Sequence, residues 1–203
     1  GIAGRLNVDT QDIRLFKRVD KEWVAQRVAN ISPYLISGSN LAVAAREMPL
    51  GKVSKMVYGN KPVEGGNLIL TTPEKEALLA AEPQAEKWIK KLLGSAEFLN
   101  GKDRWCLWLK DMDAETLAKL PESHPKISER VEKNRVYRES GDKGSDRLKL
   151  AGTPHLFRDL NNPDSYILVP RVSSERREYV PMDFLNSDVI SSDRNQMIPN
   201  ATL

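Results

Sequence analysis

The sequence has very few of the residues from which metal sites and disulfides are built. It contains one cysteine, Cys106, and two histidines, His124 and His155, in 203 residues. A single thiol cannot form an intramolecular disulfide, and this scattered set excludes a Cys/His zinc site. Cys106 lies in an apolar run, which predicts an inert buried thiol. Each histidine adjoins a proline, and this position favours a structural role over acid–base catalysis.

The common catalytic and nucleotide-binding motifs are also missing. There is no Gly-Xaa-Gly-Xaa-Xaa-Gly, no phosphate-binding Gly-Lys-Ser/Thr loop and no His-Glu-Xaa-Xaa-His. The stretch Asn30-Ile-Ser-Pro-Tyr partly matches the Asp/Asn-Pro-Pro-Tyr loop of amino-methylating enzymes. However, Ser32 stands where that loop needs its amide, and only one proline follows. We therefore predict no active site in this chain.

No apolar run is long enough to span a membrane, and there is no signal peptide. The first residue is Gly1, so we expect a piece of a longer polypeptide, cytoplasmic and bacterial, without membrane partners. A content of 40% hydrophobic and 29% charged residues is ordinary for a globular protein. Short strands, helices of ordinary length and no βαβ rhythm predict an α+β fold, with 1–203 forming a single compact domain.

The local patterns predict several elements. Asp20–Asn30 carries Trp23, Val24, Arg27 and Val28 at helical spacing, which indicates a helix. Residues 67–70 read as a strand that runs into a helix capped by Thr72. A second helix is predicted to begin at Pro83 and to continue to Leu93, with Gly94 as its stop. The apolar run 104–109 suits a central strand.

A basic helix is predicted to begin at 123–126. Along it, Lys126, Arg130, Lys133 and Tyr137 share one stripe, whereas Arg135 and Arg138 lie off the stripe near its end. The alternative is a solvated face with internal pairs such as Glu129 with Lys133.

A polar loop follows the basic helix. It spans 140–146, with Arg147 and Lys149 beyond it. A mobile basic loop next to a basic helix suits contact with phosphate groups, or has no function at all.

The segment Arg171–Pro181 combines hydroxyls, carboxylates and three arginines with a tyrosine. If it is a strand, Ser173, Glu175 and Arg177 project from one face because alternate residues share a face. A carboxylate can accept a hydrogen bond from cytosine and an arginine can donate two to guanine, so the pair suits one C·G pair in a major groove. The alternative is a surface strand on which Glu175 and Arg177 pair with each other.

Several segments, taken together and in order, resemble a known family. They are Asn30-Ile-Ser-Pro-Tyr-Leu-Ile, Arg46-Glu-Met-Pro-Leu, Met56-Val-Tyr-Gly-Asn-Lys-Pro, Gly65-Gly-Asn-Leu-Ile-Leu, Arg104-Trp-Cys-Leu-Trp-Leu, Arg135-Val-Tyr-Arg-Glu-Ser and Val172-Ser-Ser-Glu-Arg-Arg-Glu-Tyr-Val-Pro. Over about 25–195, the chain is similar to the target recognition domain of MmeI-like restriction-modification enzymes. These are large polypeptides with a nuclease, an adenine methyltransferase and a DNA-reading domain.

The resemblance implies that the chain reads a short asymmetric site in double-stranded DNA and presents an adenine to the methyltransferase domain. This fragment would hold no cofactor, and S-adenosylmethionine and a divalent metal would bind to the other domains. A carboxylate and a basic residue spaced i, i+2 help to set one base pair in the family, which assigns that role to Glu175 and Arg177. If 173–177 is instead a shared framework, the 139–147 loop would read the bases.

The candidate residues form two groups. Those expected to read bases are Glu175, Arg177, Ser173, Asp142 and Lys143. Those expected to hold the DNA backbone are Lys126, Arg130, Lys133, Arg135, Arg138, Arg147, Lys149, Arg171 and Arg176. On this assignment, Arg177→Ala relaxes one base position, whereas Lys133→Ala weakens binding to all sequences alike and reduces the salt slope by about one.

Three other functions fit parts of the sequence. The main one is a protein-docking domain of the same large enzyme, which would expose an apolar patch. A second is a free-standing methyltransferase, which would bind S-adenosylmethionine. A third is a single-strand or RNA binder, which would expose stacking aromatics. The four tryptophans lie in apolar settings, and this argues against the third function.

Overall fold

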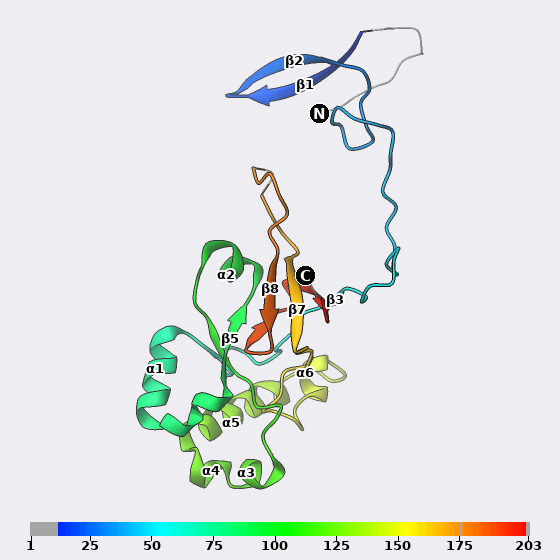
Figure 1. Cartoon of the computed structure of the whole chain (residues 1–203). Coiled ribbons are helices and arrows are strands. Elements are labelled where there is room, and N and C mark those ends of the chain that lie inside the picture. Colours follow the sequence, from blue (N-terminus) through cyan, green and yellow to red (C-terminus); the bar gives the residue numbers. More distant parts are fainter. Residues whose placement is uncertain (1–11, 175, 202–203) are drawn as a thin grey trace. The chain divides into compact units, whose positions relative to one another are not determined.

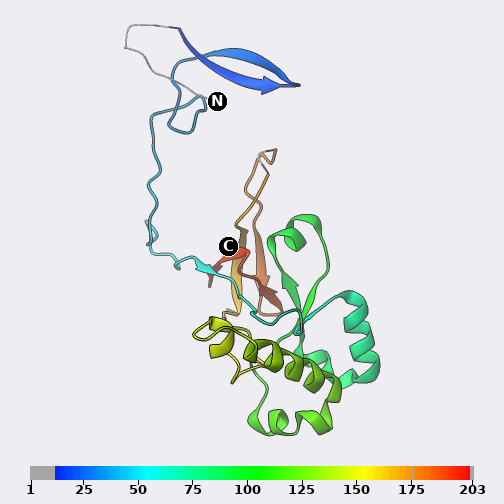
Figure 2. The ribbon, with the colours of Figure 1, turned by 180° about the vertical axis from the view of Figure 1, so that it is seen from behind.

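The computed structural model describes residues 12–174 and 176–201. The chain divides into two compact units, 1–48 and 49–203 (Figures 1 and 2). The second unit contains both helices and sheets, so the prediction of an α+β fold is confirmed. No helix among the described residues is long and apolar enough to cross a membrane.

The first unit contains a β-hairpin where the sequence predicted a helix. Strands β1 (Ile13–Val19) and β2 (Glu22–Val28) pair antiparallel, so the prediction of a helix over 20–30 is wrong. Asp20 and Lys21 form the turn with φ of 47° and 75°, the left-handed backbone that suits a two-residue hairpin turn. Trp23 is 62% exposed, which corrects the expectation that all four tryptophans lie in apolar settings.

Two four-stranded sheets organise the second unit. The first is antiparallel, in the order β3 (Val57–Tyr58), β10 (Asn195–Pro199), β7 (Ser165–Pro170) and β8 (Asp183–Asn186). The second has the order β4 (Ile69–Leu70), β6 (Trp105–Leu107), β5 (Ile89–Leu93) and β9 (Val189–Ser191), with β5 and β9 parallel. As predicted for 104–109, β6 is a central strand.

The helices gather mainly around the second sheet (Figure 1). They are α1 (Thr72–Ala81), η1 (Pro83–Trp88, a 3-10 helix), α2 (Ser95–Asn100), α3 (Ala114–Ala118), α4 (Leu120–Ser123), α5 (Pro125–Glu139) and α6 (Asp146–Lys149). The larger core includes Trp88, Leu107 and Ile127. Cys106 is buried in this core, and burial raises the pKa of its thiol.

Two predicted helix boundaries change. The cap of α1 is Thr71, not Thr72, because the Thr71 side chain accepts from Glu74 N while the Glu74 carboxylate accepts from Thr71 N. The predicted helix over 83–93 is wrong beyond Trp88. Its last five residues form β5, which lies between β6 and β9, so pairing on both sides overrides the helical spacing of the apolar residues.

Candidate nucleic-acid interface

One face of helix α5 is buried, and it combines apolar with polar side chains. Ile127, Val131, Asn134 and Arg138 follow helical spacing, and all but the half-buried Val131 are buried. Arg138 is therefore on the buried face, with 0% of its surface exposed. The helical spacing of residues 127, 131, 134 and 138 could be read from the sequence. The charged residue at the last position argued against a buried face.

The guanidinium of Arg138 donates to backbone carbonyls in two segments. Its Nε donates to Val63 O at 2.9 Å, Nη1 to Leu150 O at 3.0 Å and Thr153 O at 2.6 Å, and Nη2 to Pro62 O at 3.2 Å and Leu156 O at 2.6 Å. Desolvation lowers the pKa of Arg138 from its usual value. The prediction that Arg138 holds the DNA backbone is wrong, because every donor is already used inside the fold.

The other cations of α5 lie in ion pairs. Arg130 donates to Glu74 at 2.9 Å, Lys133 lies 2.8 Å from Glu129, and Arg135 bonds both Glu132 and Glu139. Lys126 is 4.0 Å from Glu129. The alternative of a charged face with internal pairs is therefore what this helix presents, including the predicted pair of Glu129 with Lys133.

The loop after α5 leads into α6. Arg147 donates to the Ser140 carbonyl and lies over the Tyr137 ring at 4.7 Å, while Lys149 is 3.8 Å from Asp146. Asp142 and Lys143 are exposed. Within the described part of the chain, neither has a recorded ion pair or side-chain hydrogen bond. Of the candidate residues on this loop, these two are the ones available to a ligand.

The described residues of 171–182, which are 171–174 and 176–182, form no strand, so the strand considered for this segment is not present there. Strand β7 ends at Pro170 and β8 begins at Asp183, so Arg171–Met182 is a long connection, here called the arm (Figure 1). A turn lies at its tip, where Arg177 N donates to Ser174 O at 3.0 Å and Arg176 N to Ser174 Oγ at 3.2 Å. Alternation of Ser173 with Arg177 on one strand face is therefore wrong. Glu175 lies outside the described residues.

The described residues of the arm are exposed except for the half-buried Pro181, and its arginines have no carboxylate partner among the described residues. Residues 171–174 and 176–180 are all exposed. Arg171 lies over the Tyr58 ring at 5.0 Å, and Arg177 reaches the Leu99 carbonyl at 3.4 Å. Arg176 has no recorded side-chain contact within residues 12–174 and 176–201. Three guanidiniums with spare donors are therefore held in one short segment.

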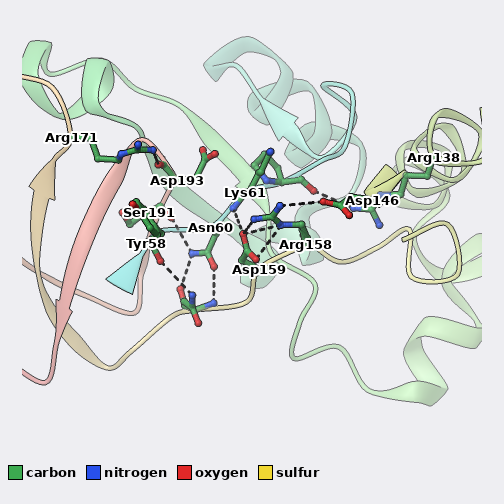
Figure 3. Close-up of polar contacts among 12 residues, drawn as sticks. Tyr58, Asn60, Lys61, Arg138, Asp146, Arg158, Asp159, Arg171, Ser191 and Asp193 are labelled. Atoms are coloured by element: carbon green, nitrogen blue, oxygen red, sulfur yellow. Dashed lines mark hydrogen bonds and ion pairs between the residues drawn. The ribbon is translucent and has the colours of Figure 1, made fainter. Parts of the chain in front are cut away.

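A buried asparagine, Asn60, joins segments of the second unit that are far apart in the sequence (Figure 3). The Asn60 side chain is fully buried; it donates to Asn161 O at 2.7 Å and Ser191 O at 3.0 Å and accepts from Asn161 N at 2.6 Å. Gly59 precedes it, and a Cβ there would lie 2.1 Å from Ser192 O. Only glycine permits this close approach, so the two residues set the position of this segment.

A polar seam extends from Asn60 in both directions (Figure 3). On one side, Lys61 N donates to Asp159 at 3.1 Å, and Arg158 lies 3.1 Å from Asp159 and 3.6 Å from Asp146, the first residue of α6. On the other side, Asp193 N donates to Asn60 O at 3.0 Å, and Arg171 Nη1 donates to Asp193 O at 3.2 Å. The seam thus joins the arm to the start of α6.

The sequence reasoning did not single out the exposed cations along this seam. Lys61, Arg158 and Arg194 are all exposed, and Lys61 and Arg194 have no recorded side-chain partner in the described part of the chain. The motif Gly59-Asn-Lys-Pro was the available signal, because a glycine before a buried amide marks a tight approach. Its distant partners were not visible along the sequence.

The arm and the loop after α5 lie at opposite ends of β7 in both views (Figures 1 and 2). Six residues of strand extend about 20 Å. The structure therefore does not bring Arg177 together with Asp142 and Lys143, and the two groups would contact different parts of a duplex. No group of three or more His, Cys, Asp or Glu residues that could hold a metal ion occurs among the described residues.

Comparison with known proteins gives three matches. The family model described as "MmeI, target recognition domain" matches residues 37–203. A protein named DNA methyltransferase A from Bacillus subtilis (strain 168) is 38% identical over 194 residues, which are 95% of this chain and 21% of that protein. A solved structure of the Type IIL restriction-modification enzyme MmeI in complex with DNA matches with a TM-score of 0.74 and 32% identity.

The structural match covers 96% of this chain and 26% of the MmeI chain. The chain thus spans only about a fifth to a quarter of the length of these relatives. The family model covers far more than half of the chain, so this protein belongs to the MmeI target recognition domain family.

Proposed function

We propose that this chain recognises a specific sequence in double-stranded DNA as the reading module of a larger restriction-modification DNA methyltransferase. Its family and its similarity to an enzyme solved with DNA support this function. Methylation and cleavage would belong to other parts of that enzyme, which would bind S-adenosylmethionine and a divalent metal. This chain would contribute recognition alone.

The observation that carries the proposal at residue level is the exposed charge of the arm, whose arginines have no carboxylate partner among residues 12–174 and 176–201. Arg171, Arg176 and Arg177 are exposed and form no ion pair with any described residue, whereas the α5 cations are mostly paired or buried. An arginine can donate two bonds to the edge of guanine in the major groove. We therefore assign base reading chiefly to the arm, with Arg177 as its principal reader, and Ser173 and Glu175 beside it.

The remaining contacts divide by position. Asp142 and Lys143 would meet the duplex at the other end of β7, where a polar loop can also reach base edges. Phosphate contacts would come from Arg171, Arg176 and the seam residue Lys61, with secondary contributions from Arg147 and Lys149. Such contacts fix the register of the protein on the duplex without reading its sequence.

Binding to a pool of randomised duplexes at several salt concentrations tests the proposal. We expect enrichment of one short asymmetric sequence, and a log affinity that falls linearly with log salt. Arg177→Ala should lower affinity for the enriched duplex about 5- to 150-fold, equivalent to about 1–3 kcal/mol, and relax one position. A chain that enriches no sequence at any salt concentration would contradict recognition.

A second function is favoured for the first unit only. Phe16 and Trp23 are 58% and 62% exposed on the hairpin, and large apolar surface of this kind marks protein contact. We therefore assign 12–48 to docking on another protein surface. Replacing both aromatics by serine should leave the affinity of the chain for the enriched duplex unchanged, and a large loss would assign the hairpin to DNA instead.

A further inference from the structure

The arm carries apolar side chains that no packing in the fold explains. Val172, Tyr179, Val180 and Met182 are 62%, 77%, 60% and 57% exposed. Tyr179 is the most exposed aromatic residue among those described. Its side chain forms no hydrogen bond, aromatic pair or cation–π contact with any residue of 12–174 or 176–201. A large aromatic side chain that stays mostly in water contributes little to folding, which makes Tyr179 a candidate for contact with a ligand.

Tyr179 differs in this respect from the other exposed tyrosine of the sheet region. The ring of Tyr58 is 55% exposed, but the guanidinium of Arg171 lies over it at 5.0 Å. Tyr58 therefore has an intramolecular partner and helps to orient Arg171. Tyr179 is 77% exposed and takes part in no aromatic pair or cation–π contact with a described residue.

The backbone is restrained on both sides of Tyr179, at the turn that ends at Arg177 and at Val180. Val180 is followed by Pro181, and a residue before proline is restricted to extended backbone. The turn from Ser174 to Arg177 closes the tip two residues before Tyr179. An aromatic residue held by a short restrained segment loses little conformational entropy when it binds.

The charges around the ring select the kind of ligand. Arg177 and Arg176 lie two and three residues before Tyr179, and Arg171 is at the base of the same arm, so these three cations outnumber the adjacent carboxylate of Glu178. Guanidiniums attract phosphates, whereas an exposed ring offers a stacking face to a base. Proteins that bend DNA from the minor groove insert apolar side chains between base steps, which partly unstacks and kinks the duplex.

We propose that Tyr179 is a wedge that inserts between two stacked bases next to those read by the arm. This inference rests on the proposed function and adds one residue and one physical role to it. The stacking of the ring on a base offsets part of the cost of opening the step, and the arginines hold the distorted backbone. Recognition would then depend on how easily a given step opens, as well as on hydrogen bonds.

The test uses the duplex that the wild-type chain enriches from the randomised pool. Each adenine in turn is replaced by 2-aminopurine, whose fluorescence rises when it is unstacked. The wild-type chain should raise the fluorescence several-fold at one position. Tyr179→Ala should abolish that rise and weaken binding about 10-fold, whereas Tyr179→Phe should keep both, because stacking needs the ring and not the hydroxyl.

Val172→Ser is the matched control, since it changes another exposed apolar residue of the same arm and should leave the fluorescence rise intact. If Tyr179→Ala binds and unstacks the duplex as the wild type does, the wedge is wrong and the exposed ring would contact a protein partner. If the wild type enriches a sequence but no position responds, the wedge is likewise wrong and recognition still holds. If no sequence is enriched, the proposed function and the wedge both fail.

Discussion

Helix α5 and the arm are two arginine-rich regions with opposite uses for their charge. On α5, Arg138 is buried with its donors on carbonyls, and Arg130 and Arg135 pair with carboxylates. On the arm, Arg176 and Arg177 are exposed and have no carboxylate partner among the described residues. Both regions have an excess of basic residues in the sequence. Only the arm keeps that charge available to a polyanion.

The contrast shows that local charge excess is a weak guide to a nucleic-acid surface. An exposed ion pair gains little stability, but it cancels the field that a phosphate would feel. A buried arginine such as Arg138 cannot contact a phosphate directly, because its donors bind backbone carbonyls inside the fold. The position of each cation relative to carboxylates and carbonyls therefore decides whether it can attract DNA.

The largest effect should come from Arg138→Ala. It leaves several buried carbonyls without a donor, so the free energy of unfolding should fall by about 3–4 kcal/mol. Urea unfolding measures this change. Arg135→Ala, on the same helix but exposed, should cost less than about 1 kcal/mol. If both variants are equally stable and only Arg138→Ala loses DNA affinity, the separation of scaffold from interface is wrong.

The second effect concerns DNA affinity instead of stability, so the substitution on the arm should have the larger effect and the one on α5 the smaller. Arg177→Ala should lose affinity for the enriched duplex by about 1–3 kcal/mol, with no change in the urea midpoint. Fluorescence anisotropy with the enriched and a scrambled duplex gives both values. Arg135→Ala should leave the ratio of the two affinities unchanged. Equal losses on both duplexes for Arg177→Ala would remove its base-reading role and leave it as a backbone contact.

The third effect concerns salt. Arg176→Ala should reduce the slope of log affinity against log salt by about one, because an unpaired guanidinium that meets a phosphate releases a counterion. Lys133→Ala was expected from the sequence to do the same. Its pair with Glu129 at 2.8 Å predicts a smaller reduction. The salt dependence of both variants is measured on a scrambled duplex. A larger reduction of the slope for Lys133→Ala than for Arg176→Ala would place the duplex on α5.

The smallest effect is a pH-dependent one at the start of α1. Hydrogen bonds from Thr71 and the Arg130 guanidinium lower the pKa of Glu74 from 4.5 to about 2. A carboxyl with a lowered pKa in the folded state contributes stability above its unfolded pKa and loses it as the pH falls toward the folded value. Glu74→Gln should therefore cost about 0.5–1 kcal/mol at pH 7.

That difference between Glu74→Gln and the wild type should shrink as the pH falls from about 4.5 toward about 2. Urea unfolding at several pH values follows it. Glu115→Gln is the control, because Glu115 forms an exposed pair with Lys119 on the short α3–α4 segment. A loss for Glu74→Gln that stays constant with pH would show that the carboxyl acts through packing and not through its charge.

The elements that the sequence predicted correctly are those with strong local signals. The basic helix begins beside Pro125, as predicted from the proline at its first turn. The apolar run around Cys106 is a central strand because both of its faces must be buried. The α+β class and the family could also be predicted, because the order of motifs along the chain can be read without knowing which residues are in contact.

The elements that were mispredicted have ambiguous periodicity. A helix fits the spacing of Trp23, Val24, Arg27 and Val28. However, residues 22–28 pair antiparallel with residues 13–19 across a turn of two residues with left-handed backbone. Ile89, Leu92 and Leu93 also fit a helix, yet pairing with β6 and β9 makes them a strand. In both cases a partner strand distant from the local window decided the backbone.

Composition and motif order were enough to establish a globular α+β chain of the MmeI target recognition family with no recognisable catalytic motif. They could not show which arginines were free, because pairing depends on residues far apart along the chain. Arg138 reaches Pro62 and Leu156, and Asn60 reaches Asn161 and Ser191. Folding brought these groups together, since a buried donor must find its acceptor wherever the chain places one.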